Sequence, residues 1–419
     1  MKAHPPYHIT HIKLDSQPLV ANLKTVPDGH YLVFWWKEIP LGHLIINPEE
    51  KLTVTDFYHK AISTIQPAME YYINAQNAEH PDWAAWLTGQ NMVAWNTWME
   101  SLLASYIPAA IPARVPVSVV ICTRNRAPDL KACLHMLQQL ICRPEEILVV
   151  DNAPTDNSTQ EVVMQFAGIT YLREPRPGLD IARNCGIAHA KASIVAYVDD
   201  DVEVDPLWVY RVWEAFKDPQ TAAITGLVLA AELQTEAQFL FETFWSFNRG
   251  YVDKFYGKDY FDQTLSYGPP IWEIGAGANM AFRKSVLEEV GYFDERLDVG
   301  AAGCNGDSEM WFRILYHGYT IRYTPRAVVY HKHRRNLEAL NRQLFSYMRG
   351  HAAAALIQQH LCKSAGYKRY LFWELPKWYL KMFRRGFPKY SSRYSLLRSE
   401  ISGLGSGVMF YLKNRKVKV

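Results

Sequence analysis

The sequence predicts an α/β fold with a mostly parallel sheet flanked by helices. From residue 117 to residue 331, short apolar runs rich in β-branched residues alternate with segments whose apolar residues recur at helical spacing. This alternation is typical of parallel strands joined by covering helices. One run, residues 193–198, ends in three consecutive carboxylates, Asp199, Asp200 and Asp201. Such a strand predicts a ligand site, because open α/β sheets bind ligands at the carboxyl ends of their strands.

The composition is that of a globular protein and excludes a disordered chain. The 419 residues are 49% hydrophobic and 21% charged, and this length accommodates two or three domains. We expect no membrane-spanning helix, because no run reaches the roughly 18–20 apolar residues that a span needs. Residues 1–6 carry no apolar stretch, so no signal peptide is expected. The six cysteines show no CxxC pairing, which favours reduced thiols in the cytoplasm over disulfides or zinc.

The small net charge of +3 hides a basic C-terminal tail. After His331 the chain holds 19 lysines and arginines against three glutamates, a balance of +16 that leaves −13 for the preceding residues. This asymmetry predicts an anionic partner for the tail. Residues 370–385 interleave aromatic and basic side chains, which favours a helix lying on an anionic membrane surface. A solvated basic face over a core stripe and an oligomer contact are the alternatives, and no nucleic-acid-binding module is recognisable.

Residues 1–106 are expected to form a small accessory β/α domain without a catalytic constellation, so packing or partner binding is its expected role. Residues 107–116 carry repeated prolines, which disfavour a helix and predict an extended linker. Within the accessory domain we expect a hairpin of strands 31–36 and 42–46 and helices at 53–76 and 92–105.

The alternating pattern defines a central domain, residues 117–335, and residues 336–419 follow as a helical region rich in basic and aromatic residues. The segment 232–272 is aromatic-rich and irregular, and a Gly/Ala loop beginning at residue 274 enters a further strand. Strands are expected at 117–122, 146–150, 169–172, 193–198, 222–229, 319–323 and 327–331, and helices at 130–140, 158–166, 180–190, 206–216, 284–290 and 307–317.

Polar side chains follow three of these strands where the strands end. Thr123 and Arg124 come after the first strand, Asp151 after the second and the three aspartates after the fourth. Because the carboxyl ends of parallel strands meet at one edge, we expect these groups to line one crevice, as in nucleotide-binding folds. The helix that begins near Gly178 adds Arg183, and a helix N-terminus with an arginine attracts phosphate. The structural alternatives are a strand-end aspartate that caps the next helix and an ordinary surface arginine.

Three adjacent carboxylates repel one another and should raise one another's pKa values. A divalent cation removes that repulsion, and Mg²⁺ or Mn²⁺ favours carboxylate and phosphate oxygens. The alternative is a solvated turn after the strand. The convergence of other polar strand ends on the same edge favours the metal site.

The order and spacing of several segments resemble family-2 glycosyltransferases of the GT-A fold, a Rossmann-like architecture. The resemblance covers residues 117–331, about half of the chain. It implies transfer of a sugar from a nucleotide diphosphate, with a UDP-sugar the expected donor, to an acceptor hydroxyl with inversion and with Mn²⁺ or Mg²⁺. The matching segments are 117–126, 148–152, 178–186, 199–201, 277–283 and 306–310.

The resemblance also assigns roles on the donor side. Thr123 and Asp151 would contact the base, and Arg183 would lie near the base or the diphosphate. Asp199 would face the ribose and adjoin the metal, which Asp201 would hold as the last residue of a D-x-D pattern. Asp200 remains a rival ligand because three aspartates leave the register open.

On the acceptor side, the loop of Gly277, Ala278 and Asn279 resembles the family's acceptor and sugar-binding region. Asp307 matches the general base of inverting members, with Glu309 as the fallback. The alternative for Asp307 is a capping role on the helix that follows.

His331 ends the last strand, where a histidine in related folds joins the metal shell, although a lone histidine is more often structural. His333 has the same standing.

Together these features predict an inverting hexosyltransferase that builds cell-surface or extracellular polysaccharide or glycolipid. A glycan or lipid-linked acceptor is expected, at the cytoplasmic face of a membrane to which the protein binds peripherally. Two alternatives stay open: a sugar nucleotidyltransferase, and a catalytically silent glycan-binding scaffold on the same fold. The sequence names neither the sugar nor the linkage nor the oligomeric state.

Overall fold

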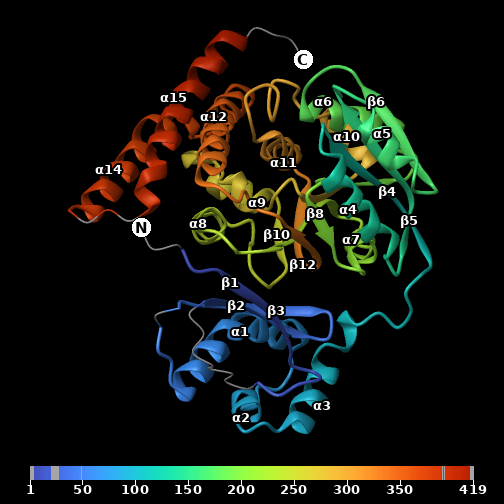
Figure 1. Cartoon of the computed structure of the whole chain (residues 1–419), viewed down its shortest axis with the longest axis vertical. Coiled ribbons are helices and arrows are strands. Elements are labelled where there is room, and N and C mark those ends of the chain that lie inside the picture. The colour runs from blue at the N-terminus through green and yellow to red at the C-terminus, as the bar shows by residue number, and fades with distance from the viewer. Residues whose placement is uncertain (1–3, 20–27, 49, 389, 391, 416–419) are drawn as a thin grey trace.

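A computed structural model of the chain describes residues 4–19, 28–48, 50–388, 390 and 392–415; the first three residues, part of the segment in which no signal peptide is expected, lie outside them. The chain forms a small sheet with its own helices at the bottom of Figure 1, a large sheet with flanking helices above it, and a group of C-terminal helices at one side. The α/β fold with a small N-terminal β/α unit and a helical C-terminal region is confirmed.

The N-terminal unit contains the expected hairpin and helices. Strands β1 (Tyr7–Lys13) and β2 (Gly29–Trp36) pair in parallel, and β2 pairs antiparallel with β3 (Ile39–Ile46). Thr53 and Asp56 form a capping box that starts the first helix. The helices are α1 (Val54–Gln76), α2 (Trp83–Thr88) and α3 (Met92–Leu102).

Strand β2 is buried on both faces, which explains its unbroken apolar run. Successive side chains of a strand point to opposite faces. Phe34 and Trp36 pack into the core beneath the N-terminal helices. Tyr31 and Trp35 face the other way, in a cluster with residues of the large sheet such as Leu229. The N-terminal unit is therefore packed directly against the large sheet.

Within the described residues the large sheet has nine strands, in the order β10-β12-β9-β11-β7-β4-β5-β6, with β8 paired to β12. The run β6-β5-β4-β7 is parallel, and β11 lies antiparallel between β7 and β9. Apolar clusters cover both faces of the sheet. The strands are β4 (Arg114–Thr123), β5 (Arg143–Asn152), β6 (Ile169–Glu174), β7 (Ile194–Val198), β8 (Val202–Val204), β9 (Thr221–Ala230), β10 (Lys254–Tyr256), β11 (Asn279–Arg283) and β12 (Thr320–His331).

The expected helices of this region are present with shifted ends. They are α4 (Ala127–Gln138), α5 (Ser158–Val163), α6 (Leu179–His189), α7 (Trp208–Ala215), α10 (Lys284–Val290) and α11 (Gly306–Tyr316).

Strands β1 and β8 were not expected from the sequence, and the structure differs from the expectation in three further places. Strand β4 begins at Arg114, inside the expected linker, because Arg114 and Val115 pair with β5 before a register shift that accommodates Pro116. The two strands expected at 319–323 and 327–331 are one strand, β12, with an irregularity between Thr324 and Val328. The segment 232–272 contains α8 (Glu236–Phe244) and α9 (Lys258–Thr264), because Thr235 caps α8 and its apolar residues follow helical spacing.

Two long helices dominate the C-terminal region, α12 (Leu337–Leu361) and α15 (Leu397–Asn414), which lie side by side in Figure 1. Gly407 makes this close approach feasible, because a Cβ there would lie 2.2 Å from the carbonyl oxygen of Arg349. Among the described residues no helix combines the length and the hydropathy needed to cross a bilayer. The shorter helical segments are α13 (Tyr367–Arg369), η4 (Tyr370–Glu374), α14 (Leu375–Gly386) and η5 (Ser392–Leu396).

Candidate active site

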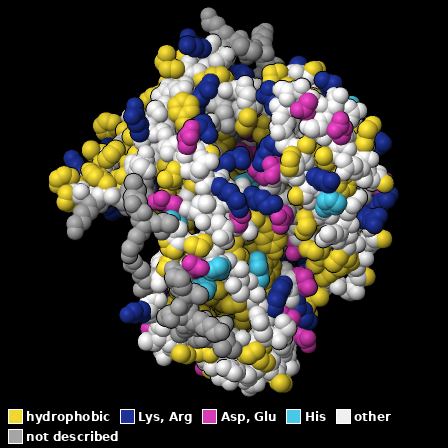
Figure 2. Space-filling view, in the orientation of Figure 1, with side chains coloured by type: hydrophobic (Ala, Val, Ile, Leu, Met, Phe, Trp, Pro, Cys, Tyr) yellow, Lys and Arg dark blue, Asp and Glu magenta, His cyan; other side chains and the backbone are white. Residues whose placement is uncertain are grey.

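A pocket of about 1630 Å³ lies at the carboxyl ends of β4, β5 and β7. Small-molecule pockets usually measure roughly 300–1,000 Å³, so this one has room for two substrates. We call the part lined by the strand ends and by the first turns of α6 and α11 the sheet side. The part lined by residues 243–249, α12 and α14 is the helix side. Figure 2 shows Lys and Arg side chains gathered across the middle of this face of the molecule, with Asp and Glu among them.

The three aspartates after β7 separate into two groups. Asp200 accepts hydrogen bonds from the Thr123 hydroxyl and from Arg126, both at 2.7 Å, so both of its oxygens are held by the protein. Asp201 accepts from Arg126 at 2.8 Å and lies 3.5 Å from Nε2 of His331. One ligand atom each from Asp199, Asp201 and His331 lies within 4.8 Å of the others. The geometry therefore groups Asp199 and Asp201 with His331 and leaves Asp200 in a structural contact.

This group of two carboxylates and an imidazole fits a divalent cation. Burial, and after it the neighbouring Asp201, raises the pKa of Asp199 to about 7. Burial lowers the pKa of His331 to about 4, so that the ring is neutral at neutral pH and has a lone pair to offer. Burial disfavours the ionised form of Asp201, but His331 and Arg126 together hold its pKa below the usual value. A cation would relieve the repulsion between the carboxylates, and this mixed oxygen and nitrogen set suits Mn²⁺.

The residues expected to bind the nucleotide base lie at the same edge of the sheet, but not all of them reach the pocket. Thr123 and Arg124 line the pocket. Asp151 is fully buried and lies behind the lining, where Oδ2 accepts from the Tyr171 hydroxyl at 2.8 Å. Burial raises the pKa of this carboxyl, and hydrogen bonds from Tyr171 and Thr159 oppose the shift. The residue that lines the pocket at this strand end is Asn152, which the sequence did not single out.

Arg183 is buried at the start of α6 and is surrounded by acids. Its Nη1 donates to Asp180 at 2.9 Å and to Asp298 at 2.6 Å. Its second terminal nitrogen would lie 3.0 Å from a Cβ added to Gly277. Arg183 therefore lies beside Gly277 and Asp307 and interacts electrostatically with the Asp307 carboxylate.

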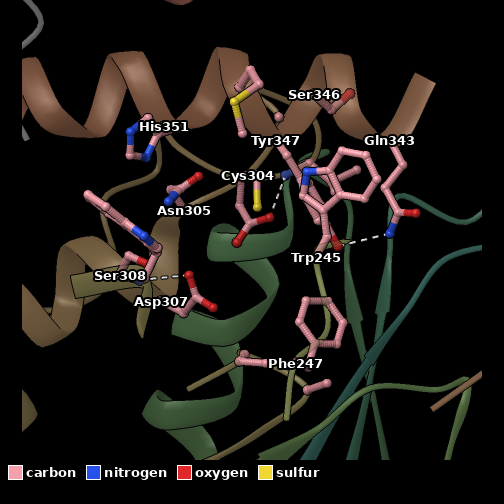
Figure 3. Close-up of a pocket in the computed structure, with 18 of the residues that line it drawn as sticks. Trp245, Phe247, Cys304, Asn305, Asp307, Ser308, Gln343, Ser346, Tyr347 and His351 are labelled. Carbon is pink, nitrogen blue, oxygen red and sulfur yellow. Dashed lines mark hydrogen bonds between the residues drawn. The ribbon is translucent and has the colours of Figure 1, made fainter. Parts of the chain in front are cut away.

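Asp307 lines the pocket in the first turn of α11, as Figure 3 shows. Its Oδ1 accepts from the backbone N–H of Ser308 at 2.6 Å. Burial, and after it the charge of Asp298, raises the pKa of Asp307, while Arg183 opposes this shift. A Cβ at Gly277 would lie 2.9 Å from Oδ2 of Asp307, so only glycine leaves this carboxylate room. The backbone of the expected acceptor loop is thus in contact with the expected base.

Two other expected residues of this region point away from the pocket. Glu309 is buried and pairs with Arg313, with both carboxylate oxygens within 2.9 Å of Nε. Asn279 is fully buried; its amide donates to the carbonyl oxygens of β9 and β12 and accepts from the Trp208 indole at 2.9 Å. Both contacts are structural. Gly277 and Ala278 do line the pocket.

The helix side is the part that the sequence did not predict. In Figure 3, Trp245 and Phe247 lie across the cavity from Asp307 and Ser308, beneath residues of α12. The pocket continues from there to Trp378 on α14. The aromatic and basic pattern of residues 370–385 was visible in the sequence, but nothing in it placed any of these rings in the same pocket as Asp307. Arg126 was equally missed, although it lies two residues after Arg124.

Comparison with known proteins gives one family and several relatives. Residues 118–291 match the model of glycosyl transferase family 2. A pre-mycofactocin glycosyltransferase of Mycobacterium tuberculosis is 27% identical over 270 residues, which are 64% of this chain and 53% of the relative. A chondroitin synthase of Escherichia coli is 28% identical over 240 residues, 52% of this chain and 34% of the relative. The chain thus spans about half or less of the length of these relatives.

Among solved structures, the mannosyltransferase PcManGT of Pyrobaculum calidifontis, in complex with GDP-Man and Mn²⁺, aligns with a TM-score of 0.47 at 16% identity. The alignment covers 79% of this chain and 96% of that one.

Proposed function

Because residues 118–291 belong to glycosyl transferase family 2, we propose that this protein is an inverting glycosyltransferase. It moves a sugar from a nucleotide diphosphate, a UDP-sugar by preference, to an acceptor hydroxyl. One observation carries the proposal. The half-buried side chain of Asp307 lines the same pocket as the group of Asp199, Asp201 and His331. A base and a metal-binding group that face one cavity are what a single displacement at an anomeric carbon requires.

Asp307 is the general base. The acceptor hydroxyl loses its proton to a carboxylate oxygen of Asp307 as it attacks the anomeric carbon. The raised pKa of Asp307 makes it a stronger base than an ordinary aspartate. Arg183 and the backbone N–H of Ser308 hold the carboxylate in place and keep it ionised. Glu309 is too firmly paired with Arg313 to take over this role.

Asp199, Asp201 and His331 would hold Mn²⁺ or Mg²⁺. A bound cation supplies charge neutralisation for the leaving diphosphate. Asp199 also lies towards the ribose, while Asp200 acts indirectly by fixing Thr123 and Arg126. Thr123, Arg124 and Asp151 are proposed to bind the base, with Thr123 and Arg124 in the pocket lining and Asp151 behind it at the same edge of the sheet.

The helix side is proposed to receive the acceptor, a glycan or lipid-linked saccharide. Its aromatic rings offer faces for sugar stacking. The pocket reaches Trp378 on α14, whose neighbourhood exposes several large apolar side chains, among them Phe372, Trp373 and Phe387. Lys377, Lys381, Arg384 and Arg385 lie along the same helix. An exposed surface of aromatic and basic residues suits an anionic membrane face.

This arrangement supports a peripheral enzyme of polysaccharide or glycolipid synthesis at the cytoplasmic side of a membrane. The proposed organisation is an accessory unit at 1–106, a linker at 107–116, the catalytic domain at 117–335 and a membrane- and acceptor-binding region at 336–419.

The experiment is a transfer assay with the variant Asp307→Asn. Thermal-shift screening of UDP-, GDP- and TDP-sugars with Mn²⁺ first identifies the donor by its stabilisation of the fold. We expect Asp307→Asn to bind that donor as the unchanged protein does and to lose transfer by about 10²- to 10⁴-fold, the contribution of a general base. Full transfer by a folded Asp307→Asn protein would refute the assignment.

The same assays separate the two alternatives. Exchange of pyrophosphate into the sugar nucleotide would identify a nucleotidyltransferase. Donor binding with neither hydrolysis nor transfer to any acceptor would identify a silent scaffold.

A further inference from the structure

A line of buried side chains leads from the candidate metal site to the N-terminal sheet. His331, the last residue of β12, has its Nδ1 3.2 Å from Nδ1 of His333. Nε2 of His333 lies 3.0 Å from Oε2 of Glu242 on α8. Oε1 of Glu242 accepts from the hydroxyl of Tyr31 on β2 at 3.0 Å. All four residues are at most 6% exposed, so water does not compete for these bonds.

The chemistry of the last group in this line determines where the protons lie. The carboxylate of Glu242 can only accept, and it accepts hydroxyl protons from Tyr31 and from Ser246, the latter at 3.2 Å. His333 must therefore donate its Nε2–H to Glu242. A neutral His333 then has a bare Nδ1, which accepts, so His331 must donate its Nδ1–H. The other ring nitrogen of His331, Nε2, then carries no proton and keeps a free lone pair. It is the nitrogen that faces Asp201.

We propose that Glu242 and Tyr31 act through His333 as positioning residues that fix the tautomer of His331, so that its Nε2 is held ready as a metal ligand. This inference rests on the proposed metal site and extends it to residues outside the pocket's sheet side. Metal-binding histidines commonly donate their other ring N–H to a fixed acceptor, which sets the tautomer and orientation of the ring. Here the acceptor is a second histidine, and a carboxylate lies one step further.

Aromatic neighbours restrict the orientation of the His331 and His333 rings. Phe247 meets His331 edge-on, with ring centres 5.4 Å apart and planes at 88°. Phe241 lies 4.5 Å from the ring of His333. Because both rings are wedged by aromatic neighbours, a ring flip that would exchange Nδ1 and Nε2 of His331 requires these residues to move.

The same geometry gives the N-terminal unit a part in the site. Tyr31 belongs to β2, and its ring is stacked 5.0 Å from that of His43 on β3. No residue of the unit lines the pocket among those that the structure describes. Its contribution is therefore exerted at a distance, through one hydroxyl that keeps an oxygen of Glu242 occupied and oriented.

The first test reads the tautomer directly in metal-free protein. Nitrogen-15 spectra of histidine-labelled protein at pH 8, assigned with His331→Gln and His333→Gln, report which ring nitrogen carries the proton. We expect His331 to carry it on Nδ1 and His333 on Nε2. A neutral His331 protonated on Nε2 would overturn the proposal, whatever the transfer assays show, because this measurement involves neither donor nor acceptor.

The second test measures Mn²⁺ affinity by titration without sugar nucleotide. Glu242→Gln should weaken Mn²⁺ binding about 10- to 100-fold, the usual cost of losing an outer partner of a metal ligand. Tyr31→Phe should weaken it less and in the same direction. Tyr7→Phe is the matched control, since this buried tyrosine belongs to the same sheet but its hydroxyl donates to Asn47.

Unchanged Mn²⁺ affinity in Glu242→Gln, with a melting curve that shows a folded protein, would refute the inference. If Glu242→Gln fails to fold, Tyr31→Phe and the tautomer of the unchanged protein decide the matter. Equal weakening by Tyr31→Phe and Tyr7→Phe would show a general packing effect and count against it as well.

Discussion

The sheet side of the pocket consists mainly of charged groups, and the helix side is rich in aromatic rings. On the sheet side, charged groups are held at strand ends by short bonds, as Arg126 is held between Asp200 and Asp201. On the helix side, rings such as Trp245 and Tyr347 come from segments about a hundred residues apart and pack by apolar contact. Charged groups stabilise a bound ligand or a transition state only when they are positioned to within a fraction of an ångström, and the strands of a parallel sheet hold them that rigidly. Shape can be assembled by helices that differ between proteins of the same fold.

The first prediction concerns the candidate metal ligands on the sheet side. Asp201→Asn removes one carboxylate of the group with Asp199 and His331 and should weaken Mn²⁺ binding by about 100-fold or more. Asp200→Asn is its neighbouring control. Because both oxygens of Asp200 are engaged by Thr123 and Arg126, that variant should lose thermal stability and keep Mn²⁺ affinity within a few-fold. Calorimetric titration with Mn²⁺ compares the affinities of the two variants. A larger loss of affinity in Asp200→Asn than in Asp201→Asn would identify Asp200 as the metal ligand.

The second prediction tests the helix side at its outer face. The double variant Trp373→Ser, Phe383→Ser removes two exposed rings beside the basic residues of α14 and should weaken binding to phosphatidylglycerol vesicles by about 30-fold. Binding should also fall with added salt, because the basic residues are screened. Val93→Ser, Met164→Ser is the control, since these residues are still more exposed but lie on α3 and after α5. Equal loss in both double variants, or no vesicle binding by the unchanged protein, would contradict a membrane-facing α14.

The third prediction concerns pH. Asp307 can accept a proton from the acceptor hydroxyl only when its carboxylate is ionised. Burial raises the pKa of Asp307 above the usual value for aspartate, about 3.9. A raised folded-state pKa means that the carboxylate is protonated as the pH falls through that raised value. The maximal rate of transfer, with Mn²⁺ and donor saturating, should therefore drop about tenfold per pH unit below it. The residual activity of Asp307→Asn should lack this acid limb, and an identical limb in both proteins would assign the titration to another group.

Much of the sheet side could be predicted from the sequence, because local patterns fix strand ends. Thr123, Asp199, Asp201 and Arg183 all follow apolar runs or helix starts, and the structure brings them to one pocket. The sequence could not assign separate roles to the three aspartates, because nothing in it pairs Arg126 with Asp200.

The remaining failures have a different physical origin. Asn279 looked like a pocket residue because its neighbours Gly277 and Ala278 are, yet one step further the chain has entered β11 and the amide is buried in the sheet. The helix side depends on where α8, α12 and α14 pack, which is decided by contacts between residues far apart in the sequence. No periodicity within residues 232–272 or 370–385 contains that information.

The smallest expected effect on activity is that of Glu309, which lies two residues after Asp307 in the first turn of α11. Glu309→Gln removes the charge that pairs with Arg313 in a buried site and should lower the free energy of unfolding by about 3 kcal/mol. Transfer per folded molecule should stay within about twofold, since Glu309 does not line the pocket. Asp307→Asn should show the opposite pattern, with transfer lost and stability kept, because burial already disfavours its ionised form. Chemical denaturation and transfer assays on both variants measure this contrast. A Glu309→Gln protein that is stable but inactive would move the base from Asp307 to Glu309.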